Sequence, residues 1–420
     1  MKHEPFKFIT LLFIMVIFIA SILLYLPISH VTGADISFID SIFTATSALC
    51  VTGLNTIDFA NTFNVFGLII IALLIQLGGL GIICTAILVF ITMGKKVNLK
   101  FRILIKNSFN LSSLKGIVKF VLRVFKITFV IELIGALLLF INFVFKKGII
   151  KSLGISLFHS ISAFNNAGFD LLSKNGLFND YAKVITMFLI VLGGIGFLVI
   201  SEVMSKGFKN LSLQTKIILS TTICLLVIGT LGYLCTTDLN LMDSIFLSVS
   251  TRTAGFVYWD LSKISNSGYL ISVVLMFIGA SPTSTGGGIK TITFFILMLS
   301  IYSICRRRDC EIYKRRISSD VINKSLVILL TAIIIIFSAT FLITCFDPML
   351  AIKDIFFEVL SAYATVGLSL GITSSFSIMS KIILCIVMFI GRVGSLTLIS
   401  IWLKEDQRKH KYPVENIVVG

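Results

Sequence analysis

Four stretches of the chain are apolar, carry no charged side chain and are long enough to cross a bilayer as helices. These stretches are Phe8–Ile28, Val65–Met93, Ile217–Thr237 and Ser325–Phe346. Such a crossing takes about 20 apolar residues. Charged residues make up only 13% of the chain, whereas soluble proteins have about 25%. The sequence therefore predicts an all-α polytopic membrane protein and excludes a soluble enzyme and a nucleic-acid-binding module.

The basic residues gather on alternate connections between the spans. Laying the spans out alternately places five segments on one side: Met1–Lys7, Gly94–Lys126, Lys206–Lys216, Arg306–Lys324 and Lys404–Gly420. Basic connections favour the cytoplasm, so we interpret this side of the plasma membrane as cytoplasmic, with both termini inside. The opposite face is acidic and would concentrate cations at its surface. The net charge of +16 therefore indicates membrane orientation and no nucleic-acid partner.

One unit of sequence recurs four times. Each copy has an apolar span, a short half-polar segment, a string that contains glycine, and a second apolar span. The half-polar segments are Ser37–Cys50, Ser152–Phe164, Leu241–Thr251 and Ile352–Tyr363. Residues 1–93 form the first repeat, 94–205 a cytoplasmic loop and the second, 206–305 the third, 306–403 a cytoplasmic loop and the fourth, and 404–420 a cytoplasmic tail.

The glycine strings are Val51–Asn55, Asn166–Asp170, Thr253–Val257 and Thr365–Ser369. A half-helix that enters from outside and stops midway points its negative C-terminal end at the bilayer centre, which favours a cation. Irregular backbone at that depth must be buried in protein or line a water-filled cavity, where its carbonyls can replace the water shell of an ion. An ordinary helix end at glycine would need neither the half-helix nor the repetition. The predicted ion-binding residues are Val51, Thr52, Gly53, Asn166, Ala167, Gly168, Thr253, Ala254, Gly255, Thr365, Val366 and Gly367.

The second span of the third repeat is interrupted after Tyr269–Ala280 by a polar segment that ends in three glycines. Proline and successive glycines both oppose a helix, so this segment is either a kink or a flexible plug that few contacts hold. A phosphate-binding P-loop is a poor match, because Ile289 separates the last glycine from Lys290. The candidate gate residues are Ser281, Pro282, Thr283, Ser284, Thr285, Gly286, Gly287 and Gly288, together with Arg392.

Arg392 stands in an otherwise apolar last span, between Gly391 and Gly394. An intramembrane arginine costs at least about 2.5 kcal/mol and usually faces a cavity or a partner. Glu132 and Glu202 are weaker candidates, and we expect Glu202 at the membrane interface. Arg252 is expected to brace the third glycine string rather than to bind the ion.

Several of these strings together resemble one known family. VTGL, SAFNNAGFD, STRTAGF and YATVGLSLGIT resemble the four filter loops of the Trk/Ktr/HKT potassium transporter superfamily, and the match runs through essentially the whole chain. SPTSTGGGIKT resembles the family's gate loop, GRVGSLT its fourth-repeat arginine, and the length and the ending KYPVENIVVG are similar to the KtrB subunit. The resemblance implies four M1–P-loop–M2 repeats in pseudo-fourfold order around one pore, with K⁺ bound at the filter. It also implies that Arg392 contacts gate-loop carbonyls and repels K⁺.

The resemblance further implies the partners of the chain. These are a second copy in a homodimer, assisted by the tail Tyr412–Gly420, and a cytosolic KtrA-type ring that binds ATP or ADP. The ring would dock on basic loops such as Arg306–Arg316, which otherwise serve only as orientation signals. No cofactor is expected in this chain, and it is not expected to be an enzyme.

The resemblance also bears on the transported ion. In the family, serine at the first filter glycine goes with sodium, so Gly53 argues for K⁺; a dependence on Na⁺ stays open. A Na⁺-selective or mixed Na⁺/K⁺ transporter of the same fold is one alternative. An intramembrane enzyme is another, but its paired carboxylates or Ser/Lys or His/Glu constellation are not found in the sequence.

Overall fold

The computed structural model describes residues 4–81, 84–85, 91, 99, 102 and 116–394, and these residues are predominantly helical. The all-α prediction is therefore confirmed. The helices of the first half are α1 (Glu4–Tyr25), η1 (Pro27–Ser29), α2 (Phe38–Cys50), α3 (Phe59–Thr62), α4 (Val65–Leu80), α7 (Ile117–Lys147), α8 (Ile149–Phe164), α9 (Asp180–Ile195) and α10 (Phe197–Lys206).

The second half continues the pattern and adds a short β-hairpin, β1 to β2, on the connection between two helices. Its elements are α11 (Leu213–Thr236), α12 (Leu241–Ser250), η2 (Leu261–Lys263), α13 (Asn266–Phe277), α14 (Thr291–Cys305), β1 (Glu311–Ile312), β2 (Arg315–Arg316), α15 (Ser319–Phe346), α16 (Ile352–Ala364), η3 (Thr373–Ser375) and α17 (Ile378–Val393).

The order of long helix, short helix, irregular string and further helix occurs four times. Within the described residues, α7, α11 and α15 are each long and apolar enough to cross a bilayer, and the bent pair α9 and α10 would make a fourth such span. The short helices α2, α8, α12 and α16 have 10 to 16 residues. At 1.5 Å per residue they cannot cross a bilayer, as the sequence predicts.

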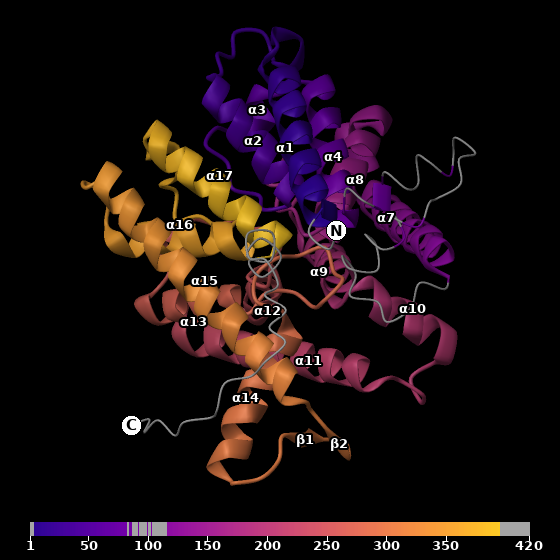
Figure 1. Cartoon of the computed structure of the whole chain (residues 1–420). Helices are drawn as coiled ribbons and strands as arrows, with labels where there is room; N and C mark the ends of the chain where they lie inside the picture. The colour runs from indigo at the N-terminus through magenta and orange to yellow at the C-terminus, as the bar shows by residue number, and fades with distance from the viewer. Residues whose placement is uncertain are drawn as a thin grey trace.

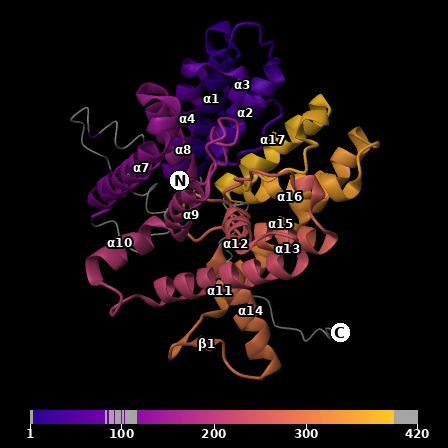
Figure 2. The same ribbon diagram turned by 180° about the vertical axis from the view of Figure 1, so that it is seen from behind.

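The four units follow one another around a common centre, which Figure 1 shows as a run of colour from indigo through magenta and pink to yellow. Figure 2 shows the same circular order from behind. The helix after each glycine string packs on the short helix of the next unit: α4 on α8, α9 on α12, α13 on α16, and α17 on α2. The last of these contacts joins the fourth unit to the first and closes the ring.

Two of these contacts between units carry an ion pair at equivalent positions. Lys183 of α9 lies 2.8 Å from Asp243 of α12, and Lys381 of α17 lies 2.8 Å from Asp40 of α2. Each aspartate is in the first turn of a short helix, where the helix dipole favours a negative charge. The pairs therefore join the second unit to the third and the fourth to the first.

Removing one member of an ion pair should destabilise the ring more than removing both members. Lys381 and Asp40 are only 12% and 13% exposed, and stranding one member of a buried pair costs up to about 3–5 kcal/mol. We expect Lys381→Met to lower the unfolding temperature in detergent and the double variant Lys381→Met/Asp40→Asn to recover part of the loss. Lys151→Met, at an exposed position on the short helix α8, is the control. Equal losses of unfolding temperature in the single and the double variant would contradict a role of the ion pair in holding the ring together.

The helix after the second glycine string breaks, which the sequence analysis expected only in the third repeat. The axes of α9 and α10 differ by 92° at Gly196, so the expectation of a single interrupted span is corrected. Gly196 has φ 101° and ψ 141°, a conformation in which only glycine is at ease. Gly81 and Gly394, at the ends of α4 and α17, have nearly the same angles. The same glycine conformation therefore ends a helix in three of the four repeats.

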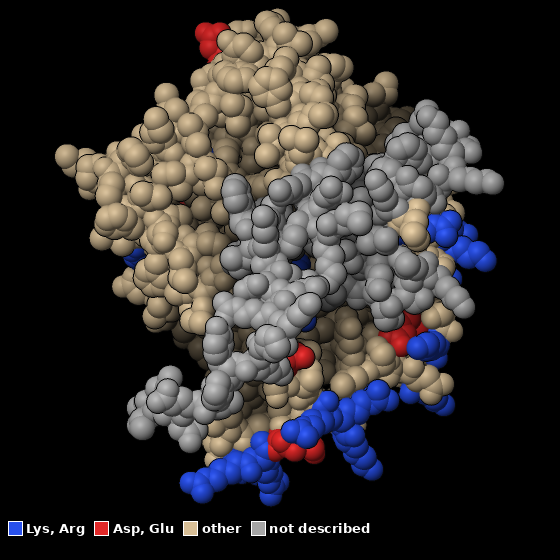
Figure 3. Space-filling model, in the orientation of Figure 1, with Lys and Arg blue, Asp and Glu red and all other residues tan. Residues whose placement is uncertain are grey.

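Charge is distributed unevenly over the surface. On the face shown in Figure 3, Lys and Arg gather at the end that carries β1 and β2 and beside α10, while most of the rest of the described surface is uncharged. The hairpin segment Arg306–Arg316 contains six of these basic residues, at Arg306, Arg307, Arg308, Lys314, Arg315 and Arg316, all largely exposed. The predicted tail Tyr412–Gly420 and most of the loop after α4 lie outside the described residues.

Candidate functional site

The four glycines of the strings form a closed ring at the centre of the molecule. A Cβ added to any of them would lie within 3.0 Å of the carbonyl oxygen that precedes the next glycine in the ring. In chain order the pairs are Gly53 with Ala167, Gly168 with Ala254, Gly255 with Val366, and Gly367 with Thr52. Because the fourth glycine meets the first string, the predicted residues from all four repeats surround one axis.

Each string holds two left-handed residues, separated by one residue of ordinary conformation. The glycines have φ between 71° and 91°, and the residues two positions earlier are also left-handed: Val51 (φ 58°), Asn166 (φ 58°), Thr253 (φ 73°) and Thr365 (φ 50°). Left-handed backbone is costly for β-branched residues, at about 1–3 kcal/mol each. An alternation of this kind can turn successive carbonyls toward one side of the chain, as ion coordination by backbone requires.

A buried serine of each short helix holds its glycine string, and the sequence analysis missed all four. Ser47 and Ser361 accept hydrogen bonds through Oγ from the N–H of Gly53 and of Gly367, each at 3.0 Å. In the other two repeats, Ser162 Oγ accepts from the N–H of Phe169 at 3.0 Å, and Ser250 Oγ donates to the carbonyl of Phe256 at 2.6 Å. The signal was present in the sequence: a serine stands five or six residues before each ring glycine.

A cavity of about 320 Å³ opens directly onto the ring. All four ring glycines contribute to its wall, and the rest is formed by residues that follow them in the chain. We call this cavity the vestibule; its lining residues are Gly53, Asn55, Gly168, Gly255, Val257, Trp259, Asp260, Leu261, Gly367, Leu368, Ser369 and Gly371.

The predicted gate segment Ser281–Gly288, here called the gate loop, lies on the opposite side of the ring. A Cβ on Gly286 would collide with the Thr253 side chain, and one on Gly287 with the Thr365 side chain. The N–H of Gly287 donates to Thr365 Oγ1 at 2.8 Å. The loop thus contacts the strings at the residues that precede the ring glycines, whereas the vestibule touches those that follow.

The gate loop is held by more contacts than the sequence predicts. Thr283 accepts the N–H of Phe197 at 3.1 Å, and Ser281 donates its N–H to the carbonyl of Gly194 at 3.1 Å. Thr285 Oγ1 also donates to the carbonyl of Phe164 at 3.3 Å. The broken helix of the second repeat supplies the first two partners, so the unexpected bend at Gly196 is part of what positions the loop.

Two basic side chains bind adjacent carbonyls of the gate loop. Arg392 donates to the carbonyl of Thr285 and also to the carbonyls of Gly78 and Gly79 on α4. Lys290 Nζ donates to the carbonyl of Gly286 at 2.6 Å. The structure thus places Arg392 against the gate loop, where the resemblance implied it, and adds Lys290, which the sequence analysis considered only for a phosphate-binding loop.

Glu132 and Glu202 have different surroundings. Glu132 is 7% exposed and accepts hydrogen bonds from Gln76 and Asn165, at 3.1 and 2.9 Å. Because Asn165 directly precedes the second glycine string, Asn166–Asp170, this buried network supports that string from behind. Glu202 instead accepts hydrogen bonds from Ser212, the N-cap of α11, and from Thr215 in the first turn of that helix, which is a structural position.

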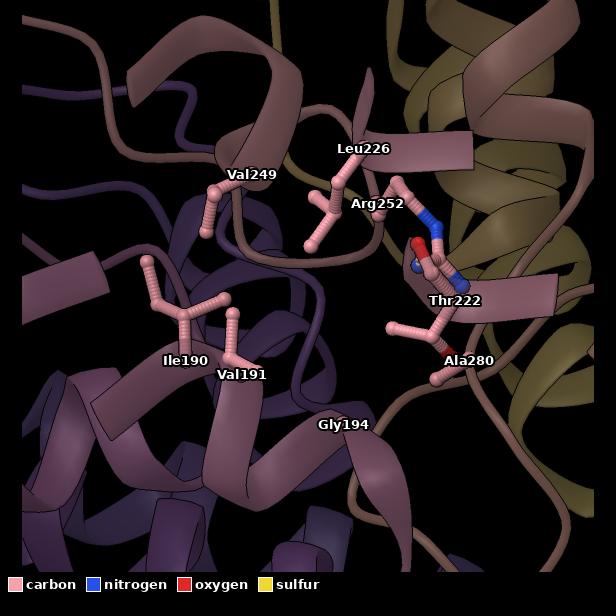
Figure 4. Close-up of a pocket in the computed structure, with 8 residues that line it drawn as sticks. All are labelled: Ile190, Val191, Gly194, Thr222, Leu226, Val249, Arg252 and Ala280. Atoms are coloured by element: carbon pink, nitrogen blue, oxygen red, sulfur yellow. Dashed lines mark hydrogen bonds between the residues drawn. The ribbon is translucent and has the colours of Figure 1, made fainter. Parts of the chain in front are cut away.

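Arg252 lies behind the third glycine string beside a cavity of about 20 Å³, room for about one water molecule. Figure 4 shows the guanidinium between Thr222 of α11 and Ala280, where the gate loop begins. It donates to the carbonyls of Thr222 and Gly279, both at 3.5 Å. The side chain does not reach the ring, and its expected bracing role stays a prediction.

Comparison with known proteins identifies the family. A family model described as TrkH, a cation transport protein, matches residues 2–237 and 208–410. The Ktr system potassium uptake protein B of Bacillus subtilis strain 168 is 38% identical over 439 residues, covering 100% of this chain and 97% of that protein. The potassium/sodium uptake protein NtpJ of Enterococcus hirae is 34% identical over 442 residues, covering 100% and 98%.

The same conclusion about the fold comes from a solved structure. The crystal structure of the potassium transporter TrkH from Vibrio parahaemolyticus matches with a TM-score of 0.77 at 17% identity, covering 97% of this chain and 86% of that one. At that identity the match shows the fold alone, and it confirms an all-α polytopic membrane protein. The chain is therefore a multi-pass membrane protein that belongs to the TrkH family of cation transport proteins, within the Trk/Ktr superfamily, and it is not an enzyme.

Proposed function

We propose that this chain is a channel-like subunit that takes up K⁺ across the plasma membrane through the ring of four glycine strings. The observation that carries the proposal is the closed ring itself, with a vestibule on one side and the gate loop on the other. The names of the relatives, potassium uptake protein B and potassium/sodium uptake protein, support the transported ion.

Each part of the site has a role in this proposal. Cations enter the vestibule, lose their water and are coordinated by the carbonyls of the strings, which the left-handed residues turn toward the axis. The C-terminal ends of the short helices add a negative potential at the same point. The gate loop, with Arg392 and Lys290, then opposes passage until the loop moves aside.

The assembly and its orientation are also proposals. The vestibule would face the outside, and the basic hairpin and both termini the cytoplasm. Two copies would form a homodimer, each with its own pore, and a cytosolic KtrA-type ring carrying ATP or ADP would dock on the exposed segment Arg306–Arg316. Within the described residues no large soluble domain is present that could bind a nucleotide, so nucleotide control would come from another polypeptide.

A Na⁺-selective or mixed transporter of the same fold is the second candidate, because one relative is named for both ions. Glycine at all four ring positions favours K⁺. Purified protein in liposomes, tested in parallel K⁺ and Na⁺ gradients, separates the candidates. Faster K⁺ than Na⁺ flux is expected, protein-free liposomes are the control, and equal or faster Na⁺ flux would refute K⁺ selectivity.

A further inference from the structure

The vestibule has a chemistry that K⁺ passage does not require. Besides the ring glycines, its wall has an apolar side formed by Val257, Leu261 and Leu368, together with one indole, Trp259, and one carboxylate, Asp260. None of its lining residues is basic. A volume of about 320 Å³ lies within the range of small-molecule sites, which are mostly apolar with a few placed polar groups.

Trp259 is held in place while part of it faces the vestibule. Its partly buried ring packs against the buried residues around Leu261 and Tyr269 on one side and around Leu247 on the other. Because it also lines the vestibule, it offers a fixed aromatic surface to a ligand there. Aromatic faces attract organic cations, and indole attracts them best.

Asp260 keeps an available carboxylate oxygen beside Trp259. Its Oδ1 accepts the N–H and the hydroxyl of Ser262, at 3.1 and 2.7 Å, and these bonds hold the pKa of Asp260 below its ordinary value. Its Oδ2 lies 3.9 Å from Lys263 Nζ, and the two side chains are 56% and 81% exposed. Exposed pairs of this kind are weak, so a cation can compete with Lys263 for Oδ2.

Asn55 adds a further acceptor to the wall of the vestibule. Its amide nitrogen donates to the carbonyl of Gly53 at 2.9 Å. Its amide oxygen is buried and has no hydrogen-bond partner within the described part of the chain. A buried acceptor without a partner is costly, and a ligand with a hydroxyl group would relieve that cost.

From these features we propose that the vestibule binds small organic ammonium ions, with the quaternary nitrogen between Trp259 and Asp260 and the apolar groups against Leu261 and Leu368. The substituents of such an ion are covalently bonded and cannot be shed as K⁺ sheds water, so the ion stays above the ring and blocks it. Binding itself stands on the vestibule alone, whereas the block rests on the proposed function.

Tryptophan fluorescence tests the binding directly, because the chain has only 2 Trp. In a Trp402→Phe background, Trp259 is the single reporter, and choline is the probe against its uncharged analogue dimethylbutanol. We expect saturable, choline-specific quenching that Asp260→Asn weakens about fivefold, the scale of an exposed charge pair, and that Lys263→Gln strengthens. Asp35→Asn, which removes an exposed carboxylate of another loop, is the matched control.

Equal quenching by choline and dimethylbutanol, or equal effects of Asp260→Asn and Asp35→Asn, would overturn the site. If Trp402→Phe does not give monodisperse protein, calorimetric titration of the unmodified chain and of Trp259→Leu replaces fluorescence; heat that survives Trp259→Leu likewise overturns it. Choline is then added to K⁺ flux measurements, where inhibition with the same concentration dependence is expected. An absence of K⁺ flux without choline would refute the proposed function and leave the binding result standing.

Discussion

Replacing Arg392 by alanine should raise K⁺ flux through the subunit without its cytosolic partner by roughly tenfold. Its guanidinium binds the carbonyl of Thr285 in the gate loop and places a positive charge beside the path of the ion. A like charge opposes a cation by about 1–4 kcal/mol at close range, depending on the local dielectric. Removing it lowers this barrier and releases one contact of the loop, and flux into liposomes measures both effects.

Shortening the gate loop should act on the same barrier. Deleting residues 282–285 removes the carbonyl of Thr285 that Arg392 binds and the contact of Thr283 with Phe197. The deletion and Arg392→Ala should therefore be non-additive. Selectivity should change little in either variant, because the ring glycines lie on the other side of the loop's contacts with Thr253 and Thr365.

The control removes a basic side chain that is remote from the gate. Lys151, near the start of α8, is exposed and far along the helix from Phe164, the residue of α8 that contacts the gate loop, so Lys151→Ala should leave K⁺ flux close to that of the parent protein. Lys290→Met, which frees the carbonyl of Gly286, should raise flux as Arg392→Ala does. Lower flux in the Arg392 and deletion variants, with folded protein, would mean that the loop is a structural kink and no gate.

Much of this architecture could be predicted because each repeat carries a local signal. The short helices, the glycine strings and the polar interruption after Ala280 each coincide with a change of composition in the sequence. Apolar runs and glycines act on the backbone nearby, so their consequences can be derived without knowing the tertiary contacts. The ring of Gly53, Gly168, Gly255 and Gly367 follows from repetition alone.

The features that were missed depend on contacts between segments that are apart in the chain, within one repeat as well as between repeats. Gly78, Gly193 and Gly391 leave no room for a Cβ, because each packs on the last carbonyls of its own short helix. The next residue is Gly79 in the first repeat and Gly194 in the second, and in the fourth it is Arg392. The pattern LGGLG, LGGIG, IGRVG would have revealed that each of these helices ends at the last glycine, but only once these glycines had been compared as equivalents.

Gly53→Ser should reduce the preference for K⁺ over Na⁺ by about tenfold while the protein remains folded. A Cβ at this position would lie 2.5 Å from the carbonyl oxygen of Ala167, and the residue has φ +91°. Both the backbone at Gly53 and the carbonyl of the next string must therefore shift, and side chains other than glycine resist this conformation. The measurement is the ratio of K⁺ to Na⁺ flux in liposomes.

Two further variants serve as controls for Gly53→Ser. One tests whether backbone strain alone changes the flux ratio, and the other tests whether the serine hydroxyl does. Gly33 also has a positive φ, +89°, but nothing lies within 4 Å of its Cβ position, so Gly33→Ser should cost stability and leave the flux ratio unchanged. Gly53→Ala adds the same Cβ without a hydroxyl and should lower the ratio as serine does. If Gly53→Ala keeps the parent's ratio while Gly53→Ser loses it, the hydroxyl rather than the displaced carbonyl alters ion choice. If both keep it, Gly53 does not belong to the filter, and the ring would select ions through the other three strings.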